Sequence, residues 1–564
     1  MSRWKELSYR ELPALSVRGA HLRCALRRVT LAWMFGVAWL AASGGSHFKI
    51  LTNLLGFNDL AFGILAALPF LATLGQVFAS VLIERTGLVK YQFIHFATIH
   101  RLLWLVAAAL PLVLPIPSSS AVVALLVVLG TSWLLSSLGA PAWMTWMGVL
   151  IPRRVRGRYF AQRGRLAMIV QVGVVVAIGI AMDRVFPTPA SIRPGPGVWV
   201  ICGILAVGSL LGTADILLFR RVPEVLPPPV TADRGGGGAA RPAVPAVRTR
   251  RRGLAEALAV LREYFLDPMR DGAFRSYVLF GATMAFSMTV AGWFFWLNAM
   301  DYLGFGSLAT NVLFLVIGPL GGIWTSRWWG RAIDRWGRRP CLFVATVGAV
   351  LCLVPWLLIT PDTPGPAILT RAVGWVLSAV GALTGQAGSL RLPAGSPVGA
   401  YCVAALGCAV GGAAWTGINL AQVGIVLGFA DGNGRSRYVA ASSVLTSTGG
   451  MLGGVVGGGL AQSLRALQDT PLRWGPIVWN NWHVAFAVAL LSRSLALVWL
   501  VGMPDPGAGR IRAFTRHLGV NAYNAMITRL FYPVRVFGWA LRRKTTQRRG
   551  RRSKRGVRPG RPKD

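Results

Sequence analysis

The chain has 564 residues, of which 54% are hydrophobic and 14% charged, and its mean hydropathy is +0.54. A soluble protein of this size needs far more charged surface, so the composition excludes a soluble globular fold. The net charge of +40 comes from basic residues that gather between apolar segments rather than within them.

Apolar runs of about 20 residues recur along the chain, and a helix of that length crosses the hydrocarbon core of a bilayer. The sequence therefore predicts an all-α integral membrane protein. Twelve transmembrane helices are predicted, at residues 29–48, 60–83, 91–111, 121–147, 164–182, 198–219, 274–298, 307–327, 341–360, 398–428, 438–461 and 483–502. Lys and Arg crowd alternate connecting segments and both terminal segments, so both termini are expected in the cytoplasm.

The predicted spans fall into two groups of six. Residues 1–28 form a basic cytoplasmic N-terminus without the short apolar core and cleavage site of a signal peptide. Residues 29–219 form the first six-helix bundle, and residues 274–502 form the second. Between them, residues 220–273 are rich in Pro, Gly and Arg and are predicted to be a flexible cytoplasmic linker. Residues 503–564 form a basic cytoplasmic tail.

Three short sequences recur in the same order in both groups. They are LGF at 55–57 and 303–305, LIERTGLVK at 82–90 with AIDRWGRRP at 332–340, and RGRYFA at 156–161 with RSRYVA at 435–440. Repeats at matching positions in two six-span halves indicate a duplicated, pseudo-symmetric fold, a pattern typical of transporters.

An insertion at 361–397 separates the ninth and tenth predicted spans. It contains the apolar stretch TRAVGWVLSAVGALTGQAG. Counting this stretch as a thirteenth span would place RSRYVA on the opposite side of the membrane from RGRYFA and break the charge rule. The insertion is therefore predicted to be an interfacial or periplasmic segment.

The segment GRAIDRWGRRP, residues 330–340, combines a carboxylate, two glycines and several arginines between the eighth and ninth predicted spans. Glycine permits a tight turn, and a carboxylate at one helix end can meet the positive N-terminus of another helix. The segment closely resembles the signature loop of the major facilitator superfamily, and residues 82–90 resemble a degraded copy with Glu84 in place of Asp. The positive-inside rule alone would explain the arginines, but not Asp334 or the glycines.

The resemblance covers residues 29–502 and implies two pseudo-symmetric six-helix bundles. It also implies a cytoplasmic gate that closes when the transporter faces outward. Asp334 would then meet the beginning of the fifth helix, and Glu84 would meet the beginning of the eleventh. The gate residues implied in this way are Glu84, Arg85, Gly87, Arg158, Arg163, Gly330, Asp334, Arg335, Gly337, Arg338 and Arg437.

The same resemblance implies a central cavity lined by the first, fourth, seventh and tenth helices. These spans supply His47, Trp143, Trp146, Trp293, Trp296, Asn298, Trp415, Asn419 and Gln422. Aromatic walls with a few amides suit a ring-shaped or sugar-like solute. Tryptophan is also common at the membrane interface of any membrane protein, which is the alternative interpretation.

Several polar and small residues lie inside predicted spans. Arg101 and Arg493 lie deep in the third and twelfth spans, where an ionisable group needs a partner or a role. Pairing inside a bundle is favoured for both, and Arg101 is also a cavity candidate. Asp215 lies about one turn before Arg220 and is predicted at the membrane interface. The stretch GGMLGGVVGGGLA at 449–461 has the small-xxx-small spacing that predicts close packing, here against the second span.

The favoured function is a secondary transporter of the bacterial cytoplasmic (inner) membrane that moves a small solute by alternating access. No enzymatic activity, cofactor, metal or nucleic acid is expected, and the six cysteines contain no CxxC pair. Anionic lipid headgroups are expected against the basic linker and tail, and the protein is expected to be a monomer. One alternative is a non-transporting sensor or scaffold. A polytopic membrane enzyme is another, but it would need clustered acids, and acids of the outer loops such as Asp59, Asp301, Asp362 and Asp469 are scattered.

Overall fold

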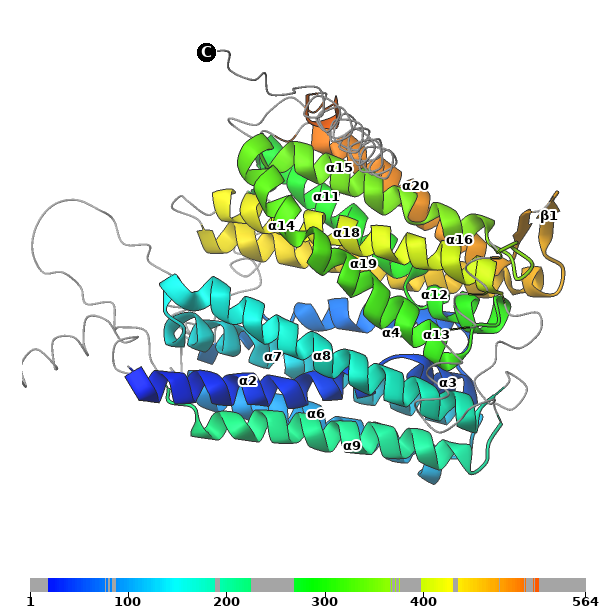
Figure 1. Ribbon diagram of the computed structural model, residues 1–564, viewed down its shortest axis with the longest axis horizontal. Coiled ribbons are helices and arrows are strands. Elements are labelled where there is room, and N and C mark those ends of the chain that lie inside the picture. The colour runs from blue at the N-terminus through cyan, green and yellow to red at the C-terminus, as the bar shows by residue number, and fades with distance from the viewer. Residues whose placement is uncertain are drawn as a thin grey trace, which may run out of the picture.

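The computed structural model describes most of the two predicted bundles. The described residues are 19–76, 88–187, 193–224, 268–365, 397–429, 435–475 and 477–501, with 78, 79, 82, 83, 367, 371, 375, 503, 511 and 513–516. The predicted linker and tail, and most of the insertion at 361–397, lie outside these residues. Long helices run side by side along the longest axis of the molecule (Figure 1).

The helices of the N-terminal half follow the six predicted spans. They are α2 (Gly19–Ala42), α3 (Ser46–Leu55), α4 (Asp59–Thr73), α6 (Val89–Val113), α7 (Ser119–Leu150), α8 (Arg153–Val185) and α9 (Gly197–Leu218), with the 3-10 turn η3 (Phe219–Arg221). The repeated LGF sequence makes the turn between α3 and α4. Gly56 adopts a φ of 93°, which glycine tolerates and other residues rarely adopt, and the Asn58 side chain caps α4 by accepting from the Ala61 N–H at 2.9 Å.

The C-terminal half repeats this order. Its elements are η5 (Pro268–Arg270), α11 (Gly272–Ala291), α12 (Phe294–Leu297), the π-helical turn η6 (Asn298–Tyr302), α13 (Ser307–Val312), the π-helical turn η7 (Leu313–Ile317), α14 (Gly318–Trp336), α15 (Arg338–Leu351), α16 (Val354–Leu358), α18 (Val398–Phe429), α19 (Arg435–Ser463), η8 (Arg465–Gln468), β1 (Leu472–Trp474), β2 (Ile477–Trp479) and α20 (Asn481–Val501). Strands β1 and β2 form a two-stranded antiparallel hairpin that the sequence did not predict.

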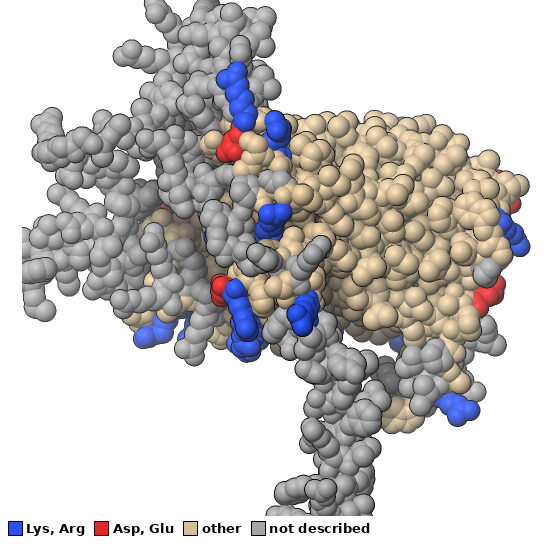
Figure 2. Space-filling view, turned by 90° about the horizontal axis from the view of Figure 1, so that it is seen from above, with Lys and Arg blue, Asp and Glu red and all other residues tan. Residues whose placement is uncertain are grey.

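The all-α membrane architecture is confirmed. Among the described residues, eleven helices are long and apolar enough to cross a bilayer. Helix α4, at the position of the predicted second span, has 15 residues and is shorter than these. Figure 2 shows a broad surface without charged side chains between two charged ends, as expected for a protein surrounded by lipid tails.

The two ends of the molecule are named by what they carry. The chain leaves the N-terminal half after Glu224 and re-enters at Pro268 at the linker end, and β1 and β2 lie at the hairpin end (Figure 1). The halves form two layers that meet mainly along α4 against α19 and α8 against α13.

Glycines in α19 allow this helix to touch both of its neighbours at backbone distance. A Cβ added to Gly454 would lie 2.6 Å from the Gly63 carbonyl oxygen, and one added to Gly458 would lie 2.8 Å from the Gly63 Cα. The prediction that this stretch packs against the second span is therefore confirmed. A neighbouring stripe, Gly449, Gly453 and Gly457, faces the backbone of α11.

Gly454→Leu should destabilise the protein, because the added side chain would collide with backbone that cannot move aside. Overpacking of this kind costs about 1–3 kcal/mol and occasionally more. A fall in melting temperature of the purified protein would register the effect. Gly459→Leu is the matched control on the same helix, since a Cβ there meets no atom within 4 Å. Equal melting of the two variants would contradict close packing at Gly454.

Two clusters of buried hydrophobic residues join the halves, a large one near the hairpin end and a small one made of Ala41, Val175 and Val316. One large cluster of buried residues includes members of both halves near the hairpin end, such as Phe62 from α4 and Phe294 from α12. Toward the linker end, the described residues form one core inside the N-terminal half and a separate core inside the C-terminal half. The halves are therefore packed together at the hairpin end and have independent cores at the linker end.

Candidate gates and central cavity

An ion pair joins the halves at the hairpin end. The ammonium group of Lys49 in α3 donates to Asp301 Oδ1 in η6. The Lys49 side chain is completely buried, whereas the Asp301 side chain is 29% exposed. A buried ammonium is costly unless it is paired, so this contact favours the arrangement in which the halves meet.

Two further carboxylates of the N-terminal half bind the C-terminal half at the same end. Asp183, near the end of α8, accepts from the backbone N–H groups of Ser307 at 2.6 Å and Leu308 at 3.0 Å, at the beginning of α13. Asp59, the first residue of α4, accepts from the indole N–H of Trp482 at 3.0 Å and the amide of Asn481 at 2.9 Å. Hydrogen bonds to charged groups are stronger than neutral ones, so these contacts reinforce the closed hairpin end.

A neutral contact lies beside the ion pair. The backbone N–H of Ser46 donates to Asn311 Oδ1 at 2.8 Å, and the Ser46 hydroxyl is buried without a partner. Where α4 and α19 meet, the hydroxyls of Thr73 and Ser447 are hydrogen-bonded to each other. These residues were not singled out by sequence reasoning, because their partners are more than 260 positions away along the chain.

Four predicted cavity residues lie near the hairpin end. Trp293 contacts Phe48 across the halves, with ring centroids 5.5 Å apart, and Trp296 contacts Trp293 at 6.4 Å. His47 is fully buried; its Nε2 pairs with the Ala42 carbonyl oxygen at 2.8 Å and its Nδ1 has no partner. Asn298 is also fully buried, and neither atom of its amide has a partner.

The other predicted cavity residues are spread over the linker-side half of the molecule. Trp146 is buried in the N-terminal core, and its indole N–H donates to the Pro223 carbonyl at 3.0 Å. Trp415 lies under the guanidinium of Arg493, whereas Asn419 is exposed and Gln422 is half-buried on the same helix, α18. The structure therefore does not gather all the predicted residues around one point.

Arg101 is paired within the N-terminal half. Its guanidinium lies 3.6 Å from Asp215 Oδ2 and stacks over the Trp39 ring at 3.3 Å from the centroid. Asp215 is 3% exposed in the interior of the bundle, where Arg101 offsets the cost of burying its charge, and its predicted position at the membrane interface stays a prediction. Its partner, Arg101, belongs to α6, so spacing along α9 could not have identified it.

Arg493 has an equivalent structural role in the C-terminal half. Its Nε donates to Ser287 Oγ at 2.9 Å, and its Nη1 donates to the Ala349 carbonyl at 2.8 Å. These bonds tie α20 to α11 and α15. The predicted internal pairing of this residue is confirmed.

The linker-end signature loop is only partly described. Gly337 ends α14 with a φ of 90°, and Asp334 in the last turn is exposed. Gly330 and Arg335 lie in α14, and Arg338 begins α15. Glu84, Arg85 and Gly87 lie outside the described residues, as do the side chains of Arg158 in α8 and Arg437 in α19.

Arg163 does not contact Asp334 in this structure. It is 7% exposed in α8, and its guanidinium lies 4.5 Å from the centroid of the Trp33 ring and 5.5 Å from that of Trp143. The resemblance implies the gate contacts for a state closed at the linker end, and several of the residues involved lie outside the described ones, so these contacts stay predictions.

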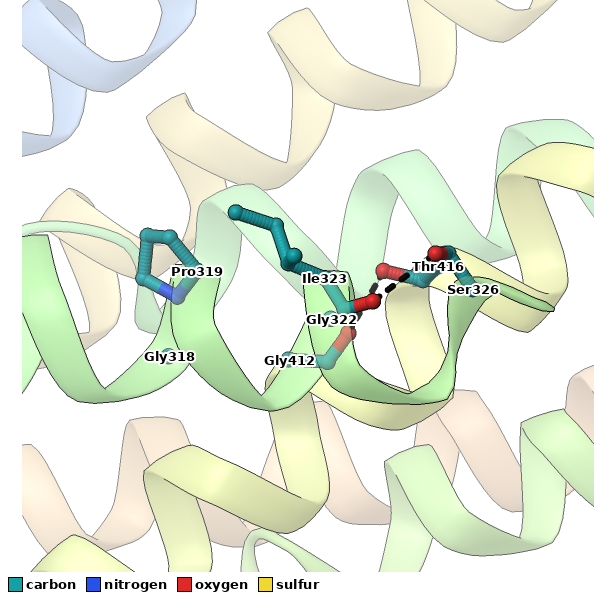
Figure 3. Close-up of a pocket in the computed structure, with 7 residues that line it drawn as sticks. All are labelled: Gly318, Pro319, Gly322, Ile323, Ser326, Gly412 and Thr416. Carbon is teal, nitrogen blue, oxygen red and sulfur yellow. Dashed lines mark hydrogen bonds between the residues drawn. The ribbon is translucent and has the colours of Figure 1, made fainter. Parts of the chain in front are cut away.

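A shallow groove of about 410 Å³ lies between α14 and α18 (Figure 3). It follows from close helix packing, because a Cβ added to Gly412 would lie 1.8 Å from the Gly318 carbonyl oxygen. Thr416 and Ser326 line it, but each donates its hydroxyl hydrogen bond within its own helix. None of the predicted cavity residues lines this groove, so it is not the predicted cavity.

No group of three or more His, Cys, Asp or Glu residues that could hold a metal occurs in the described part of the chain.

Known proteins resemble the chain in structure rather than in sequence. No family model and no curated protein matches it. The nucleoside transporter NupG superposes with a TM-score of 0.53 at 13% identity, covering 85% of this chain and 98% of that one. The xylose transporter XylE from E. coli gives 0.51 at 12% identity, with 87% and 100% covered. A D-xylose–proton symporter gives 0.52 at 11% identity, with 86% and 99% covered.

These neighbours are transporters of the major facilitator type, and the chain has their fold over about 86% of its length. The resemblance inferred from residues 330–340 is therefore confirmed at the level of the fold. Identities of 11–13% assign no subfamily and no solute.

Proposed function

We propose that this protein is a secondary transporter that moves a small solute between its two halves by alternating access. The observation that supports the proposal is the asymmetry of the core, which joins the halves at the hairpin end and is divided at the linker end. Such an arrangement is one of the two states expected when pseudo-symmetric halves rock about a central site.

We further propose that the linker end faces the cytoplasm of a bacterium, with the twelve spans in the inner membrane. The basic N-terminus, linker and tail all belong to this end under the positive-inside rule. The described state is then inward-facing. In the outward-facing state, Asp334 would meet the beginning of α8 near Arg158 and Arg163, and Glu84 would meet the beginning of α19 near Arg437.

The basic linker and tail would lie against anionic lipid headgroups in this orientation. Each cation near such a surface contributes about 1 kcal/mol.

Cysteine labelling checks the orientation. A cysteine replacing Ser119, which is exposed at the hairpin-end beginning of α7, should react with an impermeant maleimide from outside the cell. Cysteines replacing Arg234 or Ser553 should react only after the membrane is opened. Reaction at Ser553 in intact cells would overturn the twelve-span orientation.

Solute flux into liposomes tests the transport function itself. Nucleosides and pentoses are the first probes, because they are named for the neighbours NupG and XylE. Ser46→Cys and Asn311→Cys, which replace partners in contact across the halves, would be joined by a reducible cross-linker. Saturable flux that stops on cross-linking and returns on reduction supports alternating access.

Two results would point elsewhere. Product formation without flux would favour a membrane enzyme. Solute binding without flux or product would favour a sensor or scaffold.

A further inference from the structure

The guanidinium of Arg163 occupies an unusual position in the N-terminal half. It lies one turn inside the apolar span Tyr159–Val185 and is 7% exposed. The rings of Trp33, Trp143 and Phe160 surround it, with centroids 4.5, 5.5 and 5.8 Å from the guanidinium carbon. Aromatic faces attract a cation, but they leave the N–H groups around the edge of the guanidinium free to bind an acceptor.

Those N–H groups have no protein acceptor among the described residues. The buried Nε of Arg163 has no hydrogen-bond partner, and no described oxygen accepts from its guanidinium. A charged group buried in a membrane protein normally finds a partner, because leaving it unpaired is costly. An acceptor from outside the protein chain would meet this need.

The charge balance around Arg163 favours an anion as that acceptor. In the described part of this half, the interior holds Arg101, Arg163 and one nearby carboxylate, Asp215. Asp215 interacts with both arginines but forms its ion pair with Arg101, at 3.6 Å. The adjacent His100 is engaged by the Ser132 hydroxyl at 2.7 Å. Among the described residues, one positive charge is therefore left without a counter-ion in surroundings of low dielectric constant, where an anion is attracted strongly.

Arg163 lies toward the linker end of its half, between helices of the N-terminal bundle. Trp33 and Trp143 belong to α2 and α7, which are the first and fourth spans and line the cavity implied by the family resemblance. They lie toward the linker end, where the two halves have separate cores. Asp334, the expected gate partner of Arg163, is exposed at the end of α14 and does not occupy the site in this state.

We propose that Arg163 is the receptor for a carboxylate or phosphate group of the transported solute, which makes the solutes small organic anions. The planar guanidinium presents paired N–H donors that match both groups, whereas a lysine ammonium would act as a point charge. The inference rests on the proposed transport function, since it assigns the class of solute to the same cavity.

Binding to the purified full-length protein tests the proposal without requiring transport. Titration calorimetry at low salt would compare benzoate with benzamide, and uridine 5′-monophosphate with uridine, so that each pair differs in charge. We expect at least one anion to bind at least tenfold more tightly than its neutral partner. Arg163→Gln should abolish that difference, and Arg163→Lys should retain part of it. Arg165→Gln is the matched control, because Arg165 is exposed two positions away on the same helix.

Three results would overturn the proposal. The first is equal affinity for the charged and neutral members of both pairs. The second is unchanged anion binding in a folded Arg163→Gln or, if that variant does not fold, undiminished binding in Arg163→Lys. The third is inorganic phosphate alone binding as tightly as the organic anions, which would make the site one for a bare ion. If the anion site is refuted, saturable flux of neutral solutes would still support the proposed transport function. If anions bind but no solute is transported, the transport function is refuted and the anion site is not.

Discussion

Lys49→Met is expected to open the hairpin end of the protein. In the closed arrangement the Lys49 side chain is fully buried and its counter-ion, Asp301, belongs to the other half. Removing one partner of a buried ion pair costs about 3–5 kcal/mol, and the 29% exposure of Asp301 places this pair near the lower limit, at about 3 kcal/mol. This free-energy cost applies only while the hairpin end is closed. The ratio of proteins open at the hairpin end to proteins closed there should therefore rise by about a hundredfold.

A cysteine replacing Ser46 reports this opening. Ser46 is 0% exposed in the closed state and its hydroxyl makes no hydrogen bond, so the replacement should change little by itself. Its reaction with an impermeant maleimide from the hairpin end should accelerate in Lys49→Met, above the background of the six native cysteines. The double variant Lys49→Met/Asp301→Leu removes both charges and should close the end again, since an apolar pair carries no unpaired charge. An unchanged labelling rate in a folded Lys49→Met protein would refute the role of the ion pair.

The features that could be predicted from the sequence are those that depend on residues close together along the chain, such as hydropathy and glycine spacing. Span length and hydropathy predicted the all-helical membrane fold, and the described part of the second predicted span contains the 15-residue helix α4. The glycine spacing at 449–461 predicted a close helix contact, because small residues are needed wherever two backbones approach. The LGF repeat predicted the duplication, and it places Asp59 and Ser307 at equivalent positions at the beginnings of α4 and α13.

The contacts that close the hairpin end could not be predicted in this way. Asp59 and Asp301 were interpreted as scattered loop acids, but each binds the opposite half. Asn481, which binds Asp59, is 422 positions away along the chain. A local sequence pattern cannot predict which residues so far apart in the sequence come into contact. The equivalent positions of Asp59 and Ser307 were the available signal, because each makes a hydrogen bond to the opposite half: Asp59 accepts from Asn481, and the Ser307 N–H donates to Asp183.

Neighbouring residues on one helix can also have different roles. Trp143 and Trp146 were both assigned to the cavity because they lie on the fourth span. Trp146 packs against Phe93 and Phe219 in the core of its own half, whereas Trp143 stacks on Arg163. Hydropathy identifies a span but not the direction in which each side chain points, so assignment by span alone included residues of both kinds.

Asp334→Asn is expected to shift the protein in the opposite direction from Lys49→Met. Asp334 is exposed in the described state, so losing its charge costs nothing there. In the state closed at the linker end, its proposed contact with the beginning of α8 would be a charge-assisted hydrogen bond worth about 1.5–3 kcal/mol. Its loss should raise the inward-facing population about tenfold or more. Faster labelling from the linker end of a cysteine replacing Gln422, which is half-buried in α18, would show this.

Related variants separate the gate from a general effect of charge. Asp334→Glu keeps the charge and should shift the population little, and Glu84→Gln should act like Asp334→Asn but more weakly, because its copy of the signature loop is degraded. The two ends are far enough apart for their effects to add. A cysteine replacing Ser46 should therefore react more slowly in the double variant Lys49→Met/Asp334→Asn than in Lys49→Met alone. The reason is that Asp334→Asn favours the state in which the hairpin end is closed. Equal labelling of the two proteins would show that Asp334 takes no part in the gate, and the arginines beside it would then serve only to orient the protein in the membrane.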